Sequence, residues 1–227
     1  MRKGSEGRVM WRIIEPASAA EVCDWLADAY ECVDYSAALE KAQNYSEVED
    51  FSSDEFIYGE FDTGFFLDLL EHLSPSPTAT FADLGSGRGQ IVLTAAAVRT
   101  WKRCIGVEIV PILHELALGA YEVVCAINPP RALSECVFLH GRMEGLLADL
   151  AHVDVVFAYA TKFPLDENGY LSISRILHSA LKEGATVVTV NNVLDLEAGF
   201  SLETEITGPN PETNGLTNST AYIWRVC

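Results

Sequence analysis

The chain has 227 residues, 49% of them hydrophobic and 21% charged, a balance typical of one folded domain with a substantial core. Fifteen basic and 33 acidic residues give a formal net charge of −18. Such a surface repels nucleic acid and attracts basic partners such as Lys/Arg-rich protein segments, although a need for solubility would also account for it. No segment approaches about eighteen uninterrupted apolar residues, so we expect no membrane-spanning helix.

The cysteines and the N-terminal residues bear on the compartment. Six cysteines are scattered along the chain without a C-x-x-C pair, as is typical of reduced thiols in the cytoplasm or nucleus. The start of the chain is basic but no apolar stretch follows it, so we expect no secretory signal. The five histidines show no metal-ligand spacing with cysteines or acids, and we expect no metal site.

The first third of the chain is predicted to be helical. Apolar residues recur on one helical face within 18–43, and a second helix is predicted over 62–72. The breaker Ser74-Pro75-Ser76-Pro77 follows. It divides the chain into a helical N-terminal region, 1–73, and a core domain, 74–227.

Beyond this breaker, strand patterns alternate with helix patterns. Strands are predicted near 79–84, 103–108, 135–140, 153–159 and 185–191, with two more near 201–206 and 220–226. Helices are predicted near 89–99, 111–126, 143–150 and 170–182, and a loop or hairpin tip over 207–219. Alternation implies βαβ crossovers. The predicted fold class is therefore α/β, a Rossmann-like sheet of seven strands, mostly parallel, with helices on both faces and a closing antiparallel hairpin.

A glycine-rich turn follows the first predicted strand. Phe81-Ala82-Asp83-Leu84 runs into Gly85-Ser86-Gly87-Arg88-Gly89-Gln90, and a helical pattern begins at Ile91. A strand, a tight turn and a helix N-terminus form the usual cradle for a nucleotide-like ligand. A dinucleotide fingerprint would need its third glycine at Gln90, so the spacing disfavours a dinucleotide. Glu108 ends the second strand, where a carboxylate would accept both hydroxyls of a ribose.

The acid before G-x-G-x-G resembles motif I of the class I S-adenosylmethionine (SAM) methyltransferases. SAM is a cation without phosphates, so a loop flanked by acids suits it. With Tyr58-Gly59-Glu60 ahead of the core and the string from Asp83 to Gln90, the sequence is similar to the disruptor-of-telomeric-silencing family, the non-SET histone-lysine methyltransferases. This resemblance covers roughly residues 56–190, and it implies methyl transfer from SAM to a protein lysine.

The resemblance also implies roles for single residues. The methionine end of the cofactor would be lined by Tyr58, Gly59, Glu60 and Thr63. The loop beneath it would be formed by Asp83, Gly85, Gly87 and Gln90, and Glu108 would hold the ribose. The candidate catalytic residues are Tyr58 and Tyr159, in an aromatic channel that also draws on Phe163 and Tyr222. Such a channel would keep the acceptor amine uncharged by desolvation.

The sequence departs from the family at three places. Where the family has an acid after the third strand to meet the adenine, this chain has Gly141-Arg142-Met143-Glu144. We expect Arg142 and Met143 to line the cofactor there, with Glu144 or a backbone group replacing the acid. The family's Asn-Asn pair after the fourth strand corresponds to Tyr159-Ala160-Thr161, and its basic nucleosome-binding segments have no counterpart here. Two alternatives therefore stay open, a methyltransferase for a small molecule or another amine, and a SAM-binding regulatory module with little activity.

Overall fold

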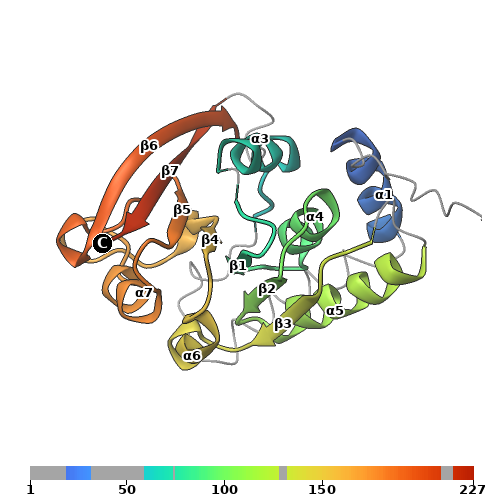
Figure 1. Ribbon diagram of the computed structural model, residues 1–227, viewed down its shortest axis with the longest axis horizontal. Coiled ribbons are helices and arrows are strands. Elements are labelled where there is room, and N and C mark those ends of the chain that lie inside the picture. The colour runs from blue at the N-terminus through green and yellow to red at the C-terminus, as the bar shows by residue number, and fades with distance from the viewer. Residues whose placement is uncertain (1–18, 32–58, 74, 128–131, 211–216) are drawn as a thin grey trace, which may run out of the picture.

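The computed structural model describes residues 19–31, 59–73, 75–127, 132–210 and 217–227. One seven-stranded sheet runs through it in the order β3-β2-β1-β4-β5-β7-β6 (Figure 1). The strands are β1 (Thr80–Leu84), β2 (Arg103–Glu108), β3 (Cys136–His140), β4 (Val155–Ala158), β5 (Thr186–Val190), β6 (Phe200–Pro209) and β7 (Asn218–Val226). The first five strands are parallel, and β7 is antiparallel to both β5 and β6. The predicted fold class is confirmed.

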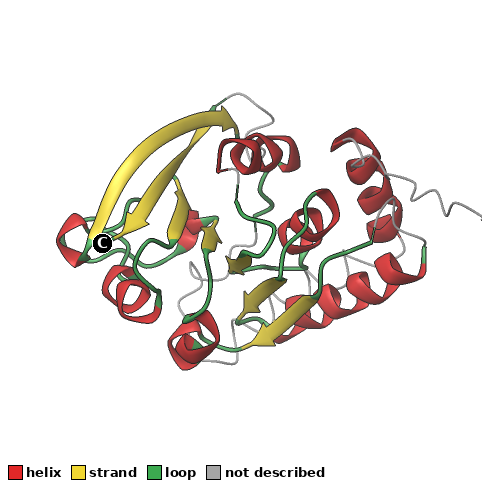
Figure 2. Cartoon of the chain, in the orientation of Figure 1, coloured by secondary structure: helices red, strands yellow, loops and turns green. Residues whose placement is uncertain are grey.

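The central strands are apolar because both of their faces are covered. Every residue of β1, β4 and β5 is buried, as expected for parallel strands between two helical layers. Neighbouring residues of β1 point to opposite faces, so Phe81 joins one core cluster and Ala82 the other. Figure 2 shows the helices flanking the strands.

The first core cluster lies under four helices. These are α1 (Ala19–Glu31), α3 (Thr63–Leu73), α4 (Gln90–Val98) and α5 (Pro111–Ala126). The second core cluster is covered by the shorter α6 (Leu147–Leu150) and α7 (Ser174–Ala180). Because α1 and α3 share one core with β1 and α4, the N-terminal helices pack directly against the sheet domain. The predicted division at residue 74 stays a prediction.

Chain order reverses in the middle of the sheet, and this positions the site. From β1 the chain moves outward through β2 and β3, then returns to the other side of β1 with β4 and β5. The loops after β1 and β4 therefore leave the same edge in opposite directions. In open α/β sheets a ligand binds in the crevice that opens there.

Two predicted helices differ from the structure. The span 143–150 is a 3₁₀ turn (Met143–Gly145) followed by the four-residue α6, because Gly145 interrupts the pattern and glycine costs about 1 kcal/mol in a helix interior. The predicted helix 170–182 begins only at Ser174. The N–H of Tyr170 donates to Asp166 Oδ1 (3.0 Å) and the N–H of Leu171 to the Val193 carbonyl (2.9 Å), so both are engaged in a loop.

The closing hairpin is longer than predicted. Strand β6 continues to Pro209 and β7 begins at Asn218, so the predicted loop 207–219 is strand at both of its ends. Continuous pairing from Phe200↔Val226 to Pro209↔Asn218, with one irregularity near Leu202, extends the strands. The predicted helix 18–43 is present up to Glu31, and its remainder lies outside the described residues.

Candidate cofactor site

The turn after β1 depends on three glycines. Gly85, Gly87 and Gly89 all have left-handed backbone conformations, with φ values of 77°, 54° and 85°. Residues with a Cβ adopt such values only at a cost. The N–H of Gly85 donates to the Val107 carbonyl (2.8 Å) and the N–H of Gly89 to the Ser86 carbonyl (2.8 Å), which closes the turn. The N-terminus of α4 is thereby directed into the turn.

The turn also packs closely on the neighbouring strands. A Cβ added to Gly89 would lie 2.8 Å from the Phe138 ring on β3, and one added to Gly106 on β2 would lie 2.7 Å from the same ring. The Gly106 Cβ would also lie 2.8 Å from Ser86 Oγ. The two glycines therefore let the turn lie directly on β2 and β3.

Glu108, the last residue of β2, supports the turn from below. Its side chain is buried, with Oε2 accepting the N–H of Gly87 (2.7 Å) and Oε1 accepting that of Val110 (2.8 Å). Burial raises the pKa of this carboxyl, and backbone N–H donors partly offset the increase. A carboxylate is thus fixed between the glycine turn and the start of α5.

Asp83 supplies a second buried acid one strand away. Its exposed fraction is 3%, and burial raises the pKa of its carboxyl well above the usual range. The Glu108 carboxylate raises the pKa of Asp83 further. A cation beside these acids would offset the repulsion between the two carboxylates. The local electrostatics therefore favour a positively charged ligand.

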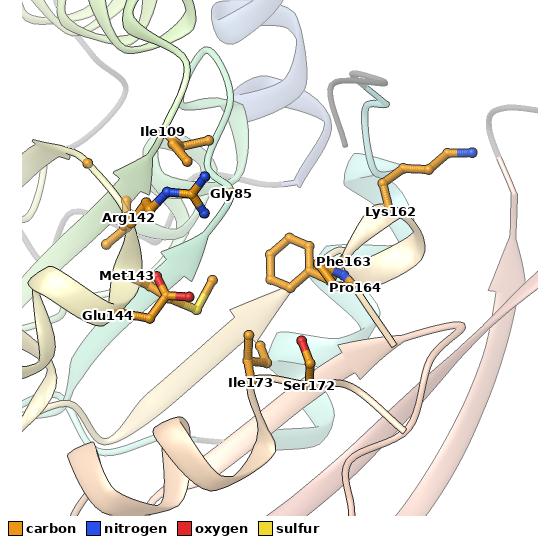
Figure 3. A pocket seen from close by; sticks show the side chains of 12 residues that line it. Gly85, Ile109, Arg142, Met143, Glu144, Lys162, Phe163, Pro164, Ser172 and Ile173 are labelled. Atoms are coloured by element: carbon orange, nitrogen blue, oxygen red, sulfur yellow. The ribbon is translucent and has the colours of Figure 1, made fainter. Parts of the chain in front are cut away.

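Two cavities open on either side of Gly85, which borders both. The larger, about 150 Å³, has mostly apolar walls that include Val107, Ile109, Met143, Phe163 and Ile173. Figure 3 shows Arg142 and Met143 reaching towards the Phe163 ring from the opposite wall, while the Lys162 side chain points away. The smaller cavity, about 30 Å³, combines acids, glycines and rings, and its walls include Gly59, Glu60, Phe61, Asp83, Gly87, Gln90, Phe157 and Tyr159.

Known proteins match both this region and the fold. The family model described as "Histone methylation protein DOT1" matches residues 35–128, which contain the glycine turn and Glu108. A histone-lysine N-methyltransferase of Caenorhabditis elegans, specific for lysine 79 of histone H3, is 26% identical over 223 residues, or 92% of this chain. The Drosophila melanogaster enzyme of the same description is 39% identical over 74 residues, or 33% of this chain.

The chain resembles the DOT1 family, whose model matches 94 of its 227 residues. It spans 22% of the length of the nematode relative and 4% of that of the fly relative. Among solved structures, an RNA methyltransferase of Salinibacter ruber in complex with S-adenosylhomocysteine (SAH) has a TM-score of 0.53 and 25% identity. That match covers 74% of this chain and 94% of the other. The fold is that of the class I methyltransferases, and SAM is the cofactor of the DOT1 family.

The site fits SAM in three respects. The apolar walls of the larger cavity suit a flat purine, and the acids around the smaller cavity suit a sulfonium and an ammonium group. The turn between them has no side chain at Gly85 or Gly87 to block a ligand that spans both cavities. Gln90 Oε1 is buried and accepts no hydrogen bond from the described residues, so it can accept one from a ligand.

Most of the predicted site residues lie around these cavities. The smaller one has in its walls Gly59, Glu60, Asp83, Gly85, Gly87, Gln90 and Tyr159, and the larger one has Arg142 and Met143. Glu108 lies beneath the turn that joins them. Thr63 is set back from the cavities and acts on Gln90, whose Nε2 donates to Thr63 Oγ1 (2.9 Å). Their roles toward a cofactor stay predictions, and Tyr58 lies outside the described residues.

Two of the four aromatic residues predicted to form the acceptor channel border the cavities, and the channel itself stays a prediction. Tyr159 and Phe163 follow β4 and border the two cavities. Tyr222, on β7, packs beside Trp224 and borders neither cavity, so nothing in its position supports a place in the channel.

Several residues of this region do not stand out in the sequence motifs, and four of them bear on the site. Ile109 and Phe61 border the cavities, and each directly follows a predicted site residue, which is the signal that could have found them. Asn192 Nδ2 donates to the Ala160 carbonyl (2.8 Å) and so fixes the loop that carries Tyr159. Arg88 is the variable position of the glycine string, and its contacts come from residues distant in sequence.

Two further findings concern metal binding and membrane-spanning helices. Among the described residues, no cluster of three or more His, Cys, Asp or Glu side chains is placed to hold a metal ion. None of the described helices is long and apolar enough to cross a membrane.

Proposed function

We propose that this chain is a SAM-dependent methyltransferase whose acceptor is a lysine of a basic protein. The observation that carries the proposal is the pair of buried acids, Asp83 and Glu108, on either side of a glycine turn that lies within the match to the DOT1 family model. Two buried carboxylates so close together repel each other, and the backbone donors to Glu108 do not neutralise this charge. A cationic ligand with a ribose accounts for both.

Each part of the site would hold a different part of the cofactor. Ile109, Met143 and Phe163 would enclose the adenine, and Glu108 would accept hydrogen bonds from the ribose. Glu60, Asp83 and Gln90 would hold the charged methionine end. Arg142 stands where an acid meets the adenine in the family, so Glu144, which borders the larger cavity, or a backbone group would take over that contact.

SAM, when bound, supplies an electrophilic methyl group for in-line displacement by a neutral amine. The chain's own contribution is to position the amine and to keep water away from it. The Phe61 ring packs against Tyr159 and Phe157, with ring centroids 5.3 and 5.1 Å apart. This aromatic wall disfavours a charged ammonium group by desolvation, so a lysine that reaches it would lose its proton more readily.

The charge of the chain favours a basic protein as substrate. The relatives from C. elegans and D. melanogaster are described as specific for lysine 79 of histone H3, so core histones are the first substrates to test. A histone substrate would place the chain in the nucleus. With 33 acids against 15 bases, direct binding to nucleic acid is disfavoured.

A second acceptor class is favoured by one observation. Tyr159-Ala160-Thr161 stands where the family has Asn-Asn, in the loop that Asn192 fixes beside the smaller cavity. A change at this place alters the shape of the acceptor channel, which suits a small-molecule amine as well as lysine. If the Tyr159-Ala160-Thr161 segment admits no acceptor at all, the chain would instead be a SAM-binding regulator.

The experiment is an incubation of the chain with methyl-labelled SAM and three acceptor pools. These are purified core histones, whole-cell lysate protein and the small-molecule fraction of the lysate. The proposal predicts acid-stable label in protein, recovered as methyl-lysine after hydrolysis. Label confined to small molecules would favour the second acceptor class, and label in none of the pools would favour the regulator. A Glu108→Gln variant, in which cofactor binding should be weakened, is the control.

A further inference from the structure

Arg88 lies at the meeting point of three parts of the chain. It belongs to the glycine turn, yet its exposed side-chain fraction is only 13%. The guanidinium lies 4.5 Å from the centroid of the Tyr30 ring on α1, and it forms a salt bridge with Glu60. One side chain thereby joins the N-terminal helix, the glycine turn and the segment ahead of α3.

Tyr30 holds this position from two sides. Its ring supports the guanidinium, while its hydroxyl donates a hydrogen bond to the backbone carbonyl of Arg88 (3.0 Å). Tyr30, which lies on α1 and contacts the turn, is buried, with an exposed fraction of 9%. Both the backbone and the side chain of Arg88 are thus fixed by a helix that borders neither cavity.

Glu60 is the other end of this connection. It lies in the wall of the smaller cavity together with Gly59 and Phe61, and the Phe61 ring supports Tyr159. A salt bridge that is largely enclosed holds its geometry better than an exposed one, since water competes less for the charges. Loss of the Arg88 side chain would therefore free Glu60 to move, and with it the wall of the smaller cavity that contains Glu60.

We infer that Arg88 is a positioning residue through which α1 sets the affinity of the site for its cofactor. With Arg88 seated on Tyr30, Glu60 is held against the glycine turn and the smaller cavity keeps its shape. The coupling is reciprocal, so a bound cofactor stabilises the docking of α1. This inference rests on the proposed function, because it takes the smaller cavity as part of the SAM site.

The test compares binding of SAH by calorimetry in matched variants. Arg88→Gln should weaken SAH binding about tenfold, within the range expected for a partly desolvated cation–π contact and ion pair. Arg103→Gln is the control, since the Arg103–Glu135 ion pair is exposed and lies at the opposite end of β2. Tyr30→Leu should weaken binding in the unaltered background but have little further effect when combined with Arg88→Gln, because the two residues act through one connection.

A second measurement separates coupling from a merely structural role. Amide hydrogen exchange of α1 should slow when the unaltered chain is saturated with SAH, and it should not respond to SAH in Arg88→Lys. This variant keeps the positive charge but lacks the flat guanidinium that rests on Tyr30. It also replaces Arg88→Gln should that variant fail to fold.

The outcomes are distinct. Absence of SAH binding to the unaltered chain would overturn the proposed function and this inference together. Binding of normal strength to both Arg88 variants, or α1 exchange that ignores SAH in the unaltered chain, would overturn the inference alone. Additive effects of Tyr30→Leu and Arg88→Gln would show that the two residues act independently, which also overturns it.

Discussion

At the scale of single residues, Glu108 has two roles, and one substitution would remove both of them. Its carboxylate supports the glycine turn through Gly87 and would accept the hydroxyl groups of the ribose. Glu108→Ala should weaken SAM binding by about 1–3 kcal/mol, the range for losing hydrogen bonds to a buried charge. Calorimetry with SAM measures this, and Glu135→Ala, at an exposed position on the far edge of the sheet, is the matched control. Unchanged affinity in a folded Glu108 variant would remove this residue from the site.

The raised pKa of Asp83 predicts a pH dependence of SAM binding. The SAM cation interacts with the ionised form of the Asp83 carboxyl, so SAM binding should release a proton where Asp83 is protonated in the ligand-free protein. SAM affinity should weaken as the pH falls through the raised pKa of Asp83 in the ligand-free protein. Calorimetry from about pH 8 down to pH 5 tests this, and Asp83→Asn should bind more weakly at neutral pH with a flatter profile. An identical pH profile in the two proteins would show that Asp83 does not face the cation.

The raised pKa of Asp83 also predicts that the Asp83→Asn variant is more stable than the unaltered protein. Because the pKa of Asp83 is raised in the folded state, the protonated form favours folding below the unfolded pKa near 3.8, and this stabilisation is lost as pH rises through the folded pKa. At neutral pH without cofactor, Asp83→Asn should therefore melt a few degrees higher, since roughly 1 kcal/mol shifts the midpoint by about 2–4 °C at this size. A lower melting temperature would mean that the ionised carboxylate has a stabilising partner.

At the scale of elements, two glycines offer a matched pair. A Cβ at Gly106 would collide with Phe138 and Ser86, whereas one at Gly119 on α5 meets nothing within 4 Å. Gly106→Ala should destabilise by about 1–3 kcal/mol through overpacking, and Gly119→Ala should stabilise by roughly 0.5–1 kcal/mol through helix propensity. Thermal or urea unfolding measures both. Equal effects would mean that the close packing of the turn on β2 and β3 is not what requires Gly106.

The elements that sequence patterns predicted well are those with strong local signals. The strands β1 and β2 and the helix α5 lie where apolar runs and the breakers around them indicated. The helix predicted over 143–150 was wrong because Gly145 outweighed an apolar pattern too short to sustain a helix.

For the site, sequence indicated the residues of the motif but not the connections between elements. Asp83 and Glu108 could be placed because they lie at the carboxyl ends of adjacent strands of one parallel sheet, Asp83 one residue before the end of β1 and Glu108 at the end of β2. Arg88 could not, since its contacts with Tyr30 and Glu60 span 58 and 28 positions and nothing local encodes them. The same holds for Asn192, whose partner Ala160 is 32 positions away.

At the scale of the whole molecule, the net charge of −18 predicts how substrate choice depends on salt. Residues 1–60 contribute 14 acids and 5 bases, a net −9 and so half of the imbalance. Methylation of a Lys/Arg-rich protein should fall steeply as salt rises to several hundred millimolar, because exposed charges are screened over about 8 Å at physiological ionic strength. SAM affinity, which depends on a partly enclosed site, should change much less. Activity that is independent of salt would rule out recruitment by charge.

The same charge predicts weak binding to duplex DNA. A gel shift at low salt and micromolar protein should show little complex, since 33 acidic residues against 15 basic ones repel the phosphates. Tight binding would reveal a basic face on the folded molecule and would favour recognition of an intact nucleosome over a free basic protein.

The most direct test of the central claim is a crystal structure of this chain with SAH. The account predicts one ligand that spans both cavities across Gly85, with the adenine between Ile109 and Phe163, the ribose hydroxyls on Glu108, and the amino-acid end against Glu60, Asp83 and Gln90. A ligand bound elsewhere, or one whose ribose does not touch Glu108, would contradict the assignment of the site.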